Sequence, residues 1–303
     1  MRALVTGASG FVGRHLVAHL EASGDEVVRL DRSEDPGVDI TDADAVGAAV
    51  ADARPEVIYH LAGWADVGAS WRNPREVLRV NAEGTLNVLE AARAAGVERV
   101  VAVASADVYG LVQEHELPLT ETSPLRPTSP YAASKVAADA IAQQAFLGHG
   151  LAVVRVRPFN HLGPGQAEGF VAPAIAARVA RAEREGQTEI PVGNLSARRD
   201  FTDVRDVVRA YRMLAIDGEP GEVYNVCSGR DVAISELADE LARLADRPIR
   251  LVQDPELMRP VDLPVLRGDA SKLTAATGWT PEVPLTQSLS DLLDDMRARV
   301  ASS

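Results

Sequence analysis

The sequence is poor in thiols, because Cys227 is the one cysteine among 303 residues. A single thiol excludes an internal disulfide and is typical of proteins in a reducing cytoplasm. We therefore expect a cytoplasmic protein that is stabilised by an apolar core, which its hydrophobic content of 46% is sufficient to build.

The sequence is also poor in positive charge. Its 31 Lys and Arg residues stand against 44 Asp and Glu residues, which gives a formal net charge of -13 and a pI near 5.0. Proteins that bind nucleic acids or anionic membranes usually carry a basic surface, so we expect neither partner. An anionic small-molecule substrate is compatible with this balance, because a few arginines suffice to form a local site.

No segment has the pattern of a targeting or membrane-spanning element. The N-terminal MRALVTGASG is typical of a strand and a turn rather than of a signal peptide. No apolar run approaches the roughly 20 residues that cross a bilayer. Internal repeats and low-complexity stretches are lacking too, so we expect one large α/β unit or two closely packed ones.

Short β-branched runs alternate with helical stretches through the first half of the chain. We expect strands at residues 2–7, 26–31, 38–40, 56–63, 99–106 and 151–160. Helices are expected after Ser129 and at residues 11–23, 42–53 and 82–95. The strands lack polar alternation and are separated by helices, which indicates a parallel sheet covered on both faces. The predicted fold class is therefore a doubly wound α/β fold of the Rossmann type.

The second half has a looser pattern, which starts with a Gly/Pro loop at residues 161–170. Helices are expected after it at residues 171–185, 202–215, 234–245 and 285–300. Residues 222–229 are expected to form a strand that could rejoin the sheet, and residues 249–254 a short strand.

These elements predict two domains of unequal size. We assign residues 1–159 mainly to an NAD(P)-binding domain, with residues 203–228 crossing back into it. Residues 160–303 are assigned mainly to a smaller C-terminal substrate-binding lid.

A glycine-rich turn joins the first predicted strand to the first helix. The stretch TGASGFVG places Gly7, Gly10 and Gly13 at the spacing of a dinucleotide-binding fingerprint, and Phe11 and Val12 lie inside it. Glycines let the backbone approach a pyrophosphate, which binds at the N-terminus of the helix. A merely tight turn is the alternative, but the strand–helix context predicts a bound dinucleotide.

An acidic residue ends the second strand. Asp31 lies where a carboxylate would accept hydrogen bonds from the adenosine ribose hydroxyls and repel a 2′-phosphate. This favours NAD as the cofactor, whereas the adjacent Arg32 favours the phosphate of NADP. Asp39 and Ile40 are expected to flank the adenine. The remaining predicted cofactor contacts lie at later strand ends, at Leu61, Ala62, Gly63 and Pro158. Ordinary strand-end packing is the alternative explanation for the small residues among them.

The stretch SPYAASK places a tyrosine and a lysine one helical turn apart. Ser129 is a good N-cap, and Pro130 suits the first helical position. Tyr131 and Lys135 therefore share one face of a helix. The pair is either an ordinary surface contact or an acid–base tyrosine whose pKa is lowered by the neighbouring ammonium.

The position of Ser105 favours the second interpretation. It lies at the carboxyl end of the fifth predicted strand, where ligands bind in open α/β sheets. Tyr131 would exchange a proton with a hydroxyl or carbonyl oxygen of a sugar, and Lys135 would stabilise its phenolate and hold the nicotinamide ribose. Ser105 would donate a hydrogen bond to the reacting oxygen.

The glycine fingerprint, Ser105 and Tyr131-x-x-x-Lys135 together resemble the extended short-chain dehydrogenase/reductase family, over essentially the whole chain. Stretches of the second half, such as RPFNHLGPGQAEGF and VGNLSARRDFTDVRDVV, narrow the resemblance to enzymes that modify nucleotide sugars. They look like GDP-4-dehydro-6-deoxy-mannose reductases and, more distantly, like GDP-mannose 4,6-dehydratases.

This resemblance implies a nucleotide-sugar substrate and three residues that bind it. Asn160 would contact the substrate, and Arg199 and Arg259 would bind the nucleotide diphosphate, with which guanidinium groups pair well. Surface salt bridging is the alternative for the two arginines. No metal site is predicted.

The residue two positions after Ser105 bears on the reaction type. Dehydratases of this family carry an acid there, usually Glu, and this chain has Asp107, which is one methylene shorter. This disfavours dehydration without excluding it, and a solvated loop carboxylate is the alternative. The leading hypothesis is a reductase of a nucleotide-linked 4-keto-6-deoxy sugar. The other hypotheses are a 4-epimerase or 4,6-dehydratase that retains its NAD, and a non-catalytic dinucleotide sensor.

Two alanine-rich helices, at residues 82–95 and 131–146, flank consecutive strands. By resemblance, family members pair two such helices in a four-helix bundle across a two-fold axis. We therefore expect a homodimer whose interface contains Ala138, Ala142 and part of the helix at residues 82–95. The alternative is that alanine serves here only as a strong helix former.

Overall fold

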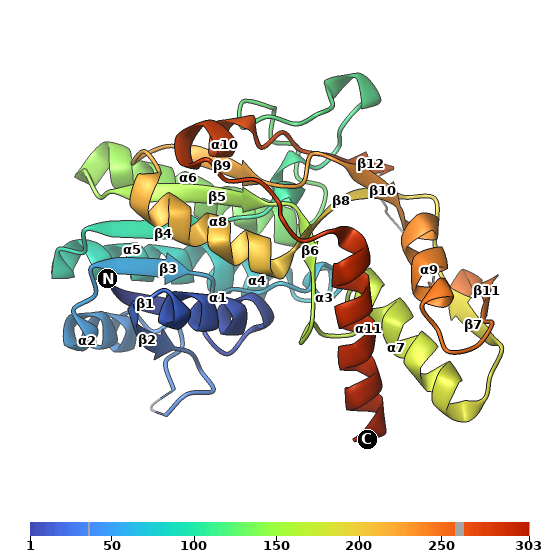
Figure 1. Ribbon diagram of the computed structural model, residues 1–303. Coiled ribbons are helices and arrows are strands. Elements are labelled where there is room, and N and C mark those ends of the chain that lie inside the picture. The colour runs from blue at the N-terminus through green and yellow to red at the C-terminus, as the bar shows by residue number, and fades with distance from the viewer. Residues whose placement is uncertain (36, 258–263, 303) are drawn as a thin grey trace.

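The computed structural model describes residues 1–35, 37–257 and 264–302 of the chain. Its centre is a sheet of six parallel strands in the order β2-β1-β3-β4-β5-β9 (Figure 1). The strands are β1 (Arg2–Thr6), β2 (Glu26–Leu30), β3 (Val57–His60), β4 (Arg99–Val103), β5 (Val153–Pro158) and β9 (Val223–Val226). The strand order changes direction between β1 and β3, as it does in a doubly wound fold, so the predicted fold class is confirmed.

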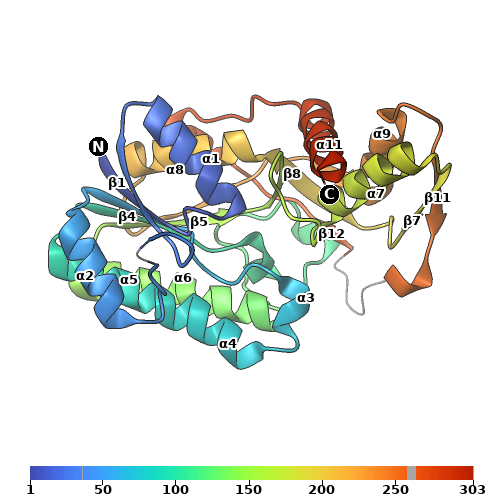
Figure 2. The same ribbon diagram turned by 90° about the horizontal axis from the view of Figure 1, so that it is seen from below.

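Two layers of helices bury this sheet (Figure 2). One face is covered by α1 (Phe11–Ala22) and α8 (Val204–Asp217), and the other by α2 (Ala43–Ala53), α5 (Gly84–Ala95) and α6 (Pro130–His149). Every residue of β3 and β5 is buried, as in a parallel sheet covered on both faces, and the alternating Arg155 and Arg157 of β5 pair with Asp139 of α6. No helix among the described residues combines the length and the apolar character needed to cross a membrane.

Residues 38–40 do not form the predicted third strand. Instead, Asp39 Oδ1 accepts hydrogen bonds from both N and Oγ1 of Thr41, so the segment closes as a turn. The apolar signal in the sequence reflects core packing. The side chain of Ile40 is 6% exposed and lies against Gly84 at the start of α5.

The C-terminal half builds a second apolar cluster between three helices. They are α7 (Val171–Glu185), α9 (Ile234–Arg243) and α11 (Leu285–Ala301), and they lie beside the central sheet rather than over it (Figure 1). The unpredicted strand β8 (Arg198–Asp203) pairs with β6 (Asn160–Leu162), β10 (Asp231–Ala233) and β12 (Val265–Leu266). A separate parallel pair is formed by β7 (Glu189–Val192) and β11 (Arg250–Gln253).

The chain returns to the central sheet after β8. As predicted, α8 packs on the sheet and β9 pairs with β5. A later segment also returns, because α10 (Ser271–Thr277) packs near β9, and Trp279 is fully buried in the same apolar cluster as α1 and α8. The boundaries of the two domains stay a prediction. The remaining short helical segments are α3 (Val67–Ser70), α4 (Pro74–Leu78), η1 (Arg79–Glu83), η2 (Ala106–Tyr109), η3 (Glu114–Glu116) and η4 (Pro255–Leu257).

The two alanines of α6 that were expected at a dimer interface face the interior of the chain. Ala138 is 6% exposed and Ala142 is 1% exposed within the monomer. The prediction that these two side chains form a dimer interface is therefore wrong. Small residues let the two helices approach each other and the sheet closely, and the outer faces carry other side chains, among them the exposed Leu86.

Candidate active site

The glycine-rich turn after β1 forms a cradle without side chains. Gly7 has a φ of +70°, and a Cβ atom there would lie 2.8 Å from Ala62 N. A Cβ atom on Gly13 would lie 2.1 Å from the Gly7 carbonyl oxygen, so neither position tolerates a side chain. The N-cap of α1 is Gly10, which makes no side-chain capping bond and leaves this helix end open to an anion. The cradle fits the pyrophosphate of NAD or NADP.

The two side chains inside the fingerprint pack against the protein. The ring of Phe11 stacks on His161 with centroids 6.1 Å apart, and Val12 packs against the core. One turn later, the His15 ring bonds to the Pro164 carbonyl oxygen at 2.8 Å. We therefore expect Phe11 and Val12 to contact a cofactor through their backbone. The contacts of Phe11 and His15 also fix the loop that follows β6 against the start of α1.

Asp31 follows β2 and reaches the glycine turn. Its Oδ2 accepts a hydrogen bond from Ser9 N at 3.3 Å, and its Oδ1 accepts from N and Oγ of Ser33 at 3.1 and 3.0 Å. Arg32 is 77% exposed, and its Nη1 lies 4.0 Å from Asp39 Oδ2. This edge offers a carboxylate for ribose hydroxyls and, beside it, a guanidinium that can turn towards a 2′-phosphate.

The two residues predicted to flank the adenine have different environments. The carboxylate of Asp39 is partly exposed, and hydrogen bonds from Thr41 hold its pKa below the ordinary value. The side chain of Ile40 is buried in the core, so only its backbone could contact an adenine.

The predicted contacts at the later strand ends lie along the carboxyl edge of the sheet. The N–H groups of Leu61 and Ala62 donate to Thr6 Oγ1 at 3.2 and 3.1 Å, which fixes the turn after β3 beside the glycine cradle. Pro158 ends β5 and is buried. These residues could present their backbone to a cofactor.

The helix α6 begins as the sequence predicts. Ser129 is its N-cap, with Oγ accepting the N–H of the third helical residue at 3.1 Å, and proline occupies the first position. Tyr131 and Lys135 are each 8% exposed, which rules out an ordinary surface pair. Lys135 Nζ donates to the Val103 carbonyl oxygen at 3.0 Å, at the end of β4. Burial lowers the pKa of Lys135 to about 8.

Ser105 and Asp107 approach the tyrosine from the loop after β4. The Tyr131 phenol lies close enough to Ser105 and Asp107 for both side chains to affect its pKa. Ser105 is the N-cap of η2, and its Oγ accepts a hydrogen bond from Asp107 N at 3.1 Å. All four predicted catalytic residues therefore converge.

The pKa of Tyr131 differs from the sequence-based expectation. Burial raises this pKa, the charge of Asp107 adds to the rise, and the hydrogen bond with Ser105 opposes it. The expected lowering by Lys135 is not found in the protein alone. The phenol is therefore protonated at neutral pH, which is the form that donates a proton.

Asn81 is a site residue that the sequence analysis did not identify. It is 2% exposed in the π-helical segment η1, and its Oδ1 accepts a hydrogen bond from Trp64 N at 2.7 Å. Its Nδ2 donates to Ser134 Oγ at 2.8 Å, and Ser134 Oγ donates to the Tyr131 carbonyl oxygen at 2.6 Å. Asn81 thus ties the end of β3 to α6, which carries the predicted catalytic pair. The sequence signal that could have identified Asn81 is a polar residue at the junction of two helical segments.

Gly63 lies between this asparagine and Lys135. A Cβ atom there would lie 2.7 Å from Asn81 Oδ1 and 3.5 Å from Lys135 Nζ. The missing side chain therefore keeps the site open at the position predicted for cofactor contact.

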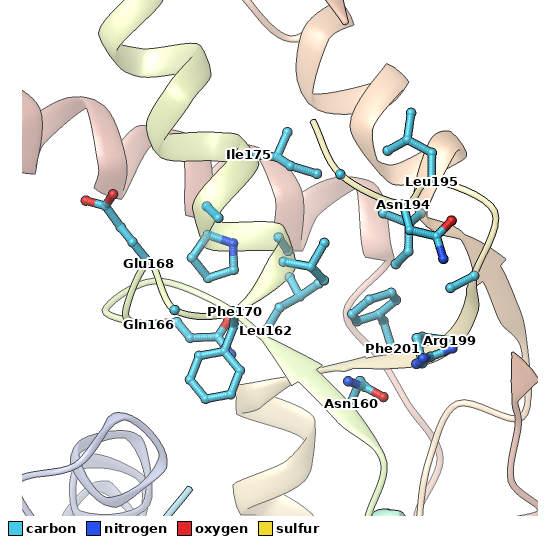
Figure 3. Close-up of a pocket in the computed structure, with 18 of the residues that line it drawn as sticks. Asn160, Leu162, Gln166, Glu168, Phe170, Ile175, Asn194, Leu195, Arg199 and Phe201 are labelled. Atoms are coloured by element: carbon cyan, nitrogen blue, oxygen red, sulfur yellow. The ribbon is translucent and has the colours of Figure 1, made fainter. Parts of the chain in front are cut away.

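A cavity of about 300 Å³ lies between α7, β6 and β8 (Figure 3). It is lined by Asn160 and Arg199, two of the three predicted substrate residues, and Figure 3 shows them at the same end. Arg259, the third, lies outside the described residues. Arg178 of α7 also lines the cavity and was not predicted. The labelled apolar residues of the cavity are Leu162, Phe170, Ile175, Leu195 and Phe201.

The strand register connects this cavity to the predicted catalytic residues. Val103 of β4 pairs with Val156 of β5. Ser105 lies two residues after Val103, and Pro158 lies two residues after Val156. Asn160 lies two residues after Pro158, at the start of β6. The cavity therefore begins at the edge of the sheet that carries the catalytic residues.

Comparison with a family model supports this arrangement. The model described as the NAD dependent epimerase/dehydratase family matches residues 3–227. This range includes the glycine cradle, α6 and β9.

Individual relatives match over nearly their full length. The chain is 40% identical to the GDP-6-deoxy-D-mannose reductase of Pseudomonas aeruginosa, over 99% of this chain and 98% of that one. The structure of RMD from Pseudomonas aeruginosa complexed with NADPH has a TM-score of 0.91 at 39% identity, covering 99% and 100% of the two chains. The UDP-glucose 4-epimerase of Thermus thermophilus in complex with NAD has a TM-score of 0.88 at 32% identity, covering 98% and 99%.

Proposed function

The chain belongs to the NAD dependent epimerase/dehydratase family, and from this premise we propose that it reduces the 4-keto group of a GDP-linked 6-deoxy sugar. As a member of this family it is an NAD(P)-dependent enzyme that acts on nucleotide sugars. The choice of reduction is supported by its 40% identity to a GDP-6-deoxy-D-mannose reductase.

The catalytic residues can supply the proton that ketone reduction requires. A bound nicotinamide cofactor would supply the hydride. Tyr131 is protonated and donates its proton to the oxygen formed at C4, and Ser105, which lies beside the phenol, donates a hydrogen bond to the same oxygen. Lys135, held by the Val103 carbonyl oxygen, stabilises the remaining phenolate.

The cavity supplies the binding site for the nucleotide sugar. Asn160 lies beside the catalytic edge and would contact the sugar end of the substrate. Arg199, on the neighbouring strand, would pair with the diphosphate, because a guanidinium binds phosphate oxygens with two parallel hydrogen bonds. The role assigned to Arg259 rests on its motif alone.

The observation that carries the proposal is the buried Tyr131 beside Ser105 at the carboxyl edge of the sheet. The experiment is a screen of GDP-, dTDP-, UDP- and ADP-linked 4-keto-6-deoxy sugars with NADH and NADPH, analysed by mass spectrometry. We expect the GDP-linked sugar to gain two hydrogens. The proposal fails if no 4-keto sugar is reduced with either cofactor.

A redox-neutral reaction is the second candidate function. It is favoured by Asp31, whose carboxylate suits the ribose of a retained NAD, and by Asp107 near the phenol. Such an enzyme oxidises and re-reduces the sugar without consuming NADH. Denaturing the purified protein and identifying the released cofactor separates the two: near-stoichiometric NAD, with no oxidation of added NADH, would support the epimerase or dehydratase.

We further propose a cytoplasmic homodimer. The single cysteine suits a reducing compartment. The outer face of α5 and α6 would form the interface, where Leu86 is 42% exposed. Sedimentation should give a dimer at micromolar concentration and a monomer for Leu86→Arg. A wild-type monomer would refute the dimer, and a dimer unaffected by Leu86→Arg would place its interface elsewhere.

A further inference from the structure

Two guanidinium groups give the cavity its positive charge. Among the described residues that line it, the charged side chains are Arg178, Arg199 and Glu168. Both carboxylate oxygens of Glu168 accept a hydrogen bond from Arg181 Nη2 at 2.8 Å. Arg181 does not line the cavity, and its charge balances that of Glu168. The two lining arginines remain as the groups that recognise an anion or a set of acceptor atoms.

The two arginines belong to different ends of the cavity. Arg199 lies with Asn160 near the catalytic edge, whereas Ile175 of α7 lies at the opposite end (Figure 3). Arg178 is three residues after Ile175 and therefore shares its helix face. Its Nη1 donates to the Pro191 carbonyl oxygen at 3.2 Å, the one hydrogen bond that the described residues give it. A guanidinium has five N–H donors, so most of the Arg178 donors are available to a ligand.

The order of groups in a nucleotide sugar decides what reaches Arg178. If the sugar lies at Tyr131 and the diphosphate at Arg199, the ribose and the base occupy the far end. Guanine offers two adjacent acceptors, O6 and N7, which match an arginine fork. Adenine places a donor beside N7, and uracil and thymine lack this adjacent pair of acceptors.

We propose that Arg178 is a specificity-determining residue that binds O6 and N7 of guanine and so selects GDP-linked substrates. This inference rests on the proposed function for the placement of the sugar and the diphosphate. Arg178 lies outside the catalytic machinery and acts on which nucleotide binds.

Calorimetric titration tests the assignment without any turnover. GDP, 7-deaza-GDP and UDP are titrated into the wild type, Arg178→Ala and the control Arg243→Ala, which removes an exposed arginine of α9 that does not line the cavity. We expect Arg178→Ala to weaken GDP binding about 10-fold or more and UDP binding less than about 2-fold, as for loss of one bidentate contact. The control should change neither.

The 7-deaza analogue identifies the atoms involved. The wild type should bind this analogue more weakly than it binds GDP. The Arg178→Ala variant should bind the analogue and GDP equally well, because the N7 contact exists only with the arginine. Equal losses for GDP and UDP would assign Arg178 to the phosphates, and no loss would remove it from the site; either result overturns the inference. Wild-type selectivity for GDP that disappears in Arg178→Ala, without reduction of any keto sugar, would support the inference and refute the proposed reaction.

Discussion

The first half of the molecule fixes its functional side chains more tightly than the second half does. Tyr131 and Lys135 are each 8% exposed, and their helix is tied to strand ends by hydrogen bonds that involve Val103 and Asn81. In the second half, Arg178 and Arg199 are only half-buried, on elements that meet around β8. We infer that the first half performs the chemistry and that the second half selects the nucleotide.

The largest effect should come from the first half. Tyr131→Phe removes the donated proton and should lower kcat by about 100-fold or more, with cofactor affinity retained. Steady-state kinetics and a cofactor titration measure both quantities. Tyr59→Phe is the matched control, because the Tyr59 hydroxyl is buried and has no hydrogen-bond partner among the described residues, so its removal should barely change kcat. Similar losses in both variants would mean that the phenol of Tyr131 has only a packing role.

The pH dependence should also come from the first half. Burial lowers the pKa of Lys135 from 10.5 to about 8, so the ammonium is lost as pH rises through 8. We expect kcat/KM, which reports the free enzyme, to fall about tenfold per pH unit above pH 8. Between pH 8 and 10.5 the unfolded chain holds the proton that the folded chain has released, so this lysine should raise the free energy of unfolding as pH rises. A flat kcat/KM profile from pH 7 to pH 10 would exclude the ammonium from the reaction.

A substitution in the second half should change binding rather than chemistry. Arg199→Ala removes a charged partner of the diphosphate and should raise KM for the nucleotide sugar about 10-fold, with a smaller change in kcat. Arg243→Ala, which removes an exposed i,i+3 ion pair on α9, is the control and should leave both constants unchanged. A loss confined to kcat would contradict the division of labour between the halves.

The smallest effect should occur at the solvent edge of the first half. Arg32 is 77% exposed, so Arg32→Ala should raise KM for NADPH about 3-fold and leave KM for NADH unchanged. Initial rates with each cofactor measure the ratio. An equal rise for both cofactors would show that Arg32 does not distinguish the 2′-phosphate from the hydroxyl.

The parts of the site that depend on local spacing could be predicted from the sequence. The Gly7–Gly13 turn and the Tyr131–Lys135 helix face each lie within a few residues, and strand order then places Ser105 beside them. The strand β8 could not be predicted, because its partners begin at residues 160, 231 and 265 and the pairing forms only in the folded chain.

Burial and long-range contacts account for the remaining differences. Ala142 had the sequence pattern of an interface residue, yet close packing of α6 on the sheet uses it inside the monomer. Asn81 acts through residues 17 and 53 positions away, a pairing that helical periodicity does not reveal. The raised pKa of Tyr131 likewise depends on burial, which spacing does not specify.

Net transfer of hydride to the sugar tests the central claim most directly. The enzyme is incubated with a GDP-linked 4-keto-6-deoxy sugar and with NADH or NADPH deuterated at C4 of the nicotinamide, in separate reactions for the two faces. The product is analysed by mass spectrometry. The account predicts one deuterium at sugar C4 for each cofactor oxidised, from one of the two faces. Conversion of the sugar with no deuterium incorporated and no cofactor consumed would contradict it.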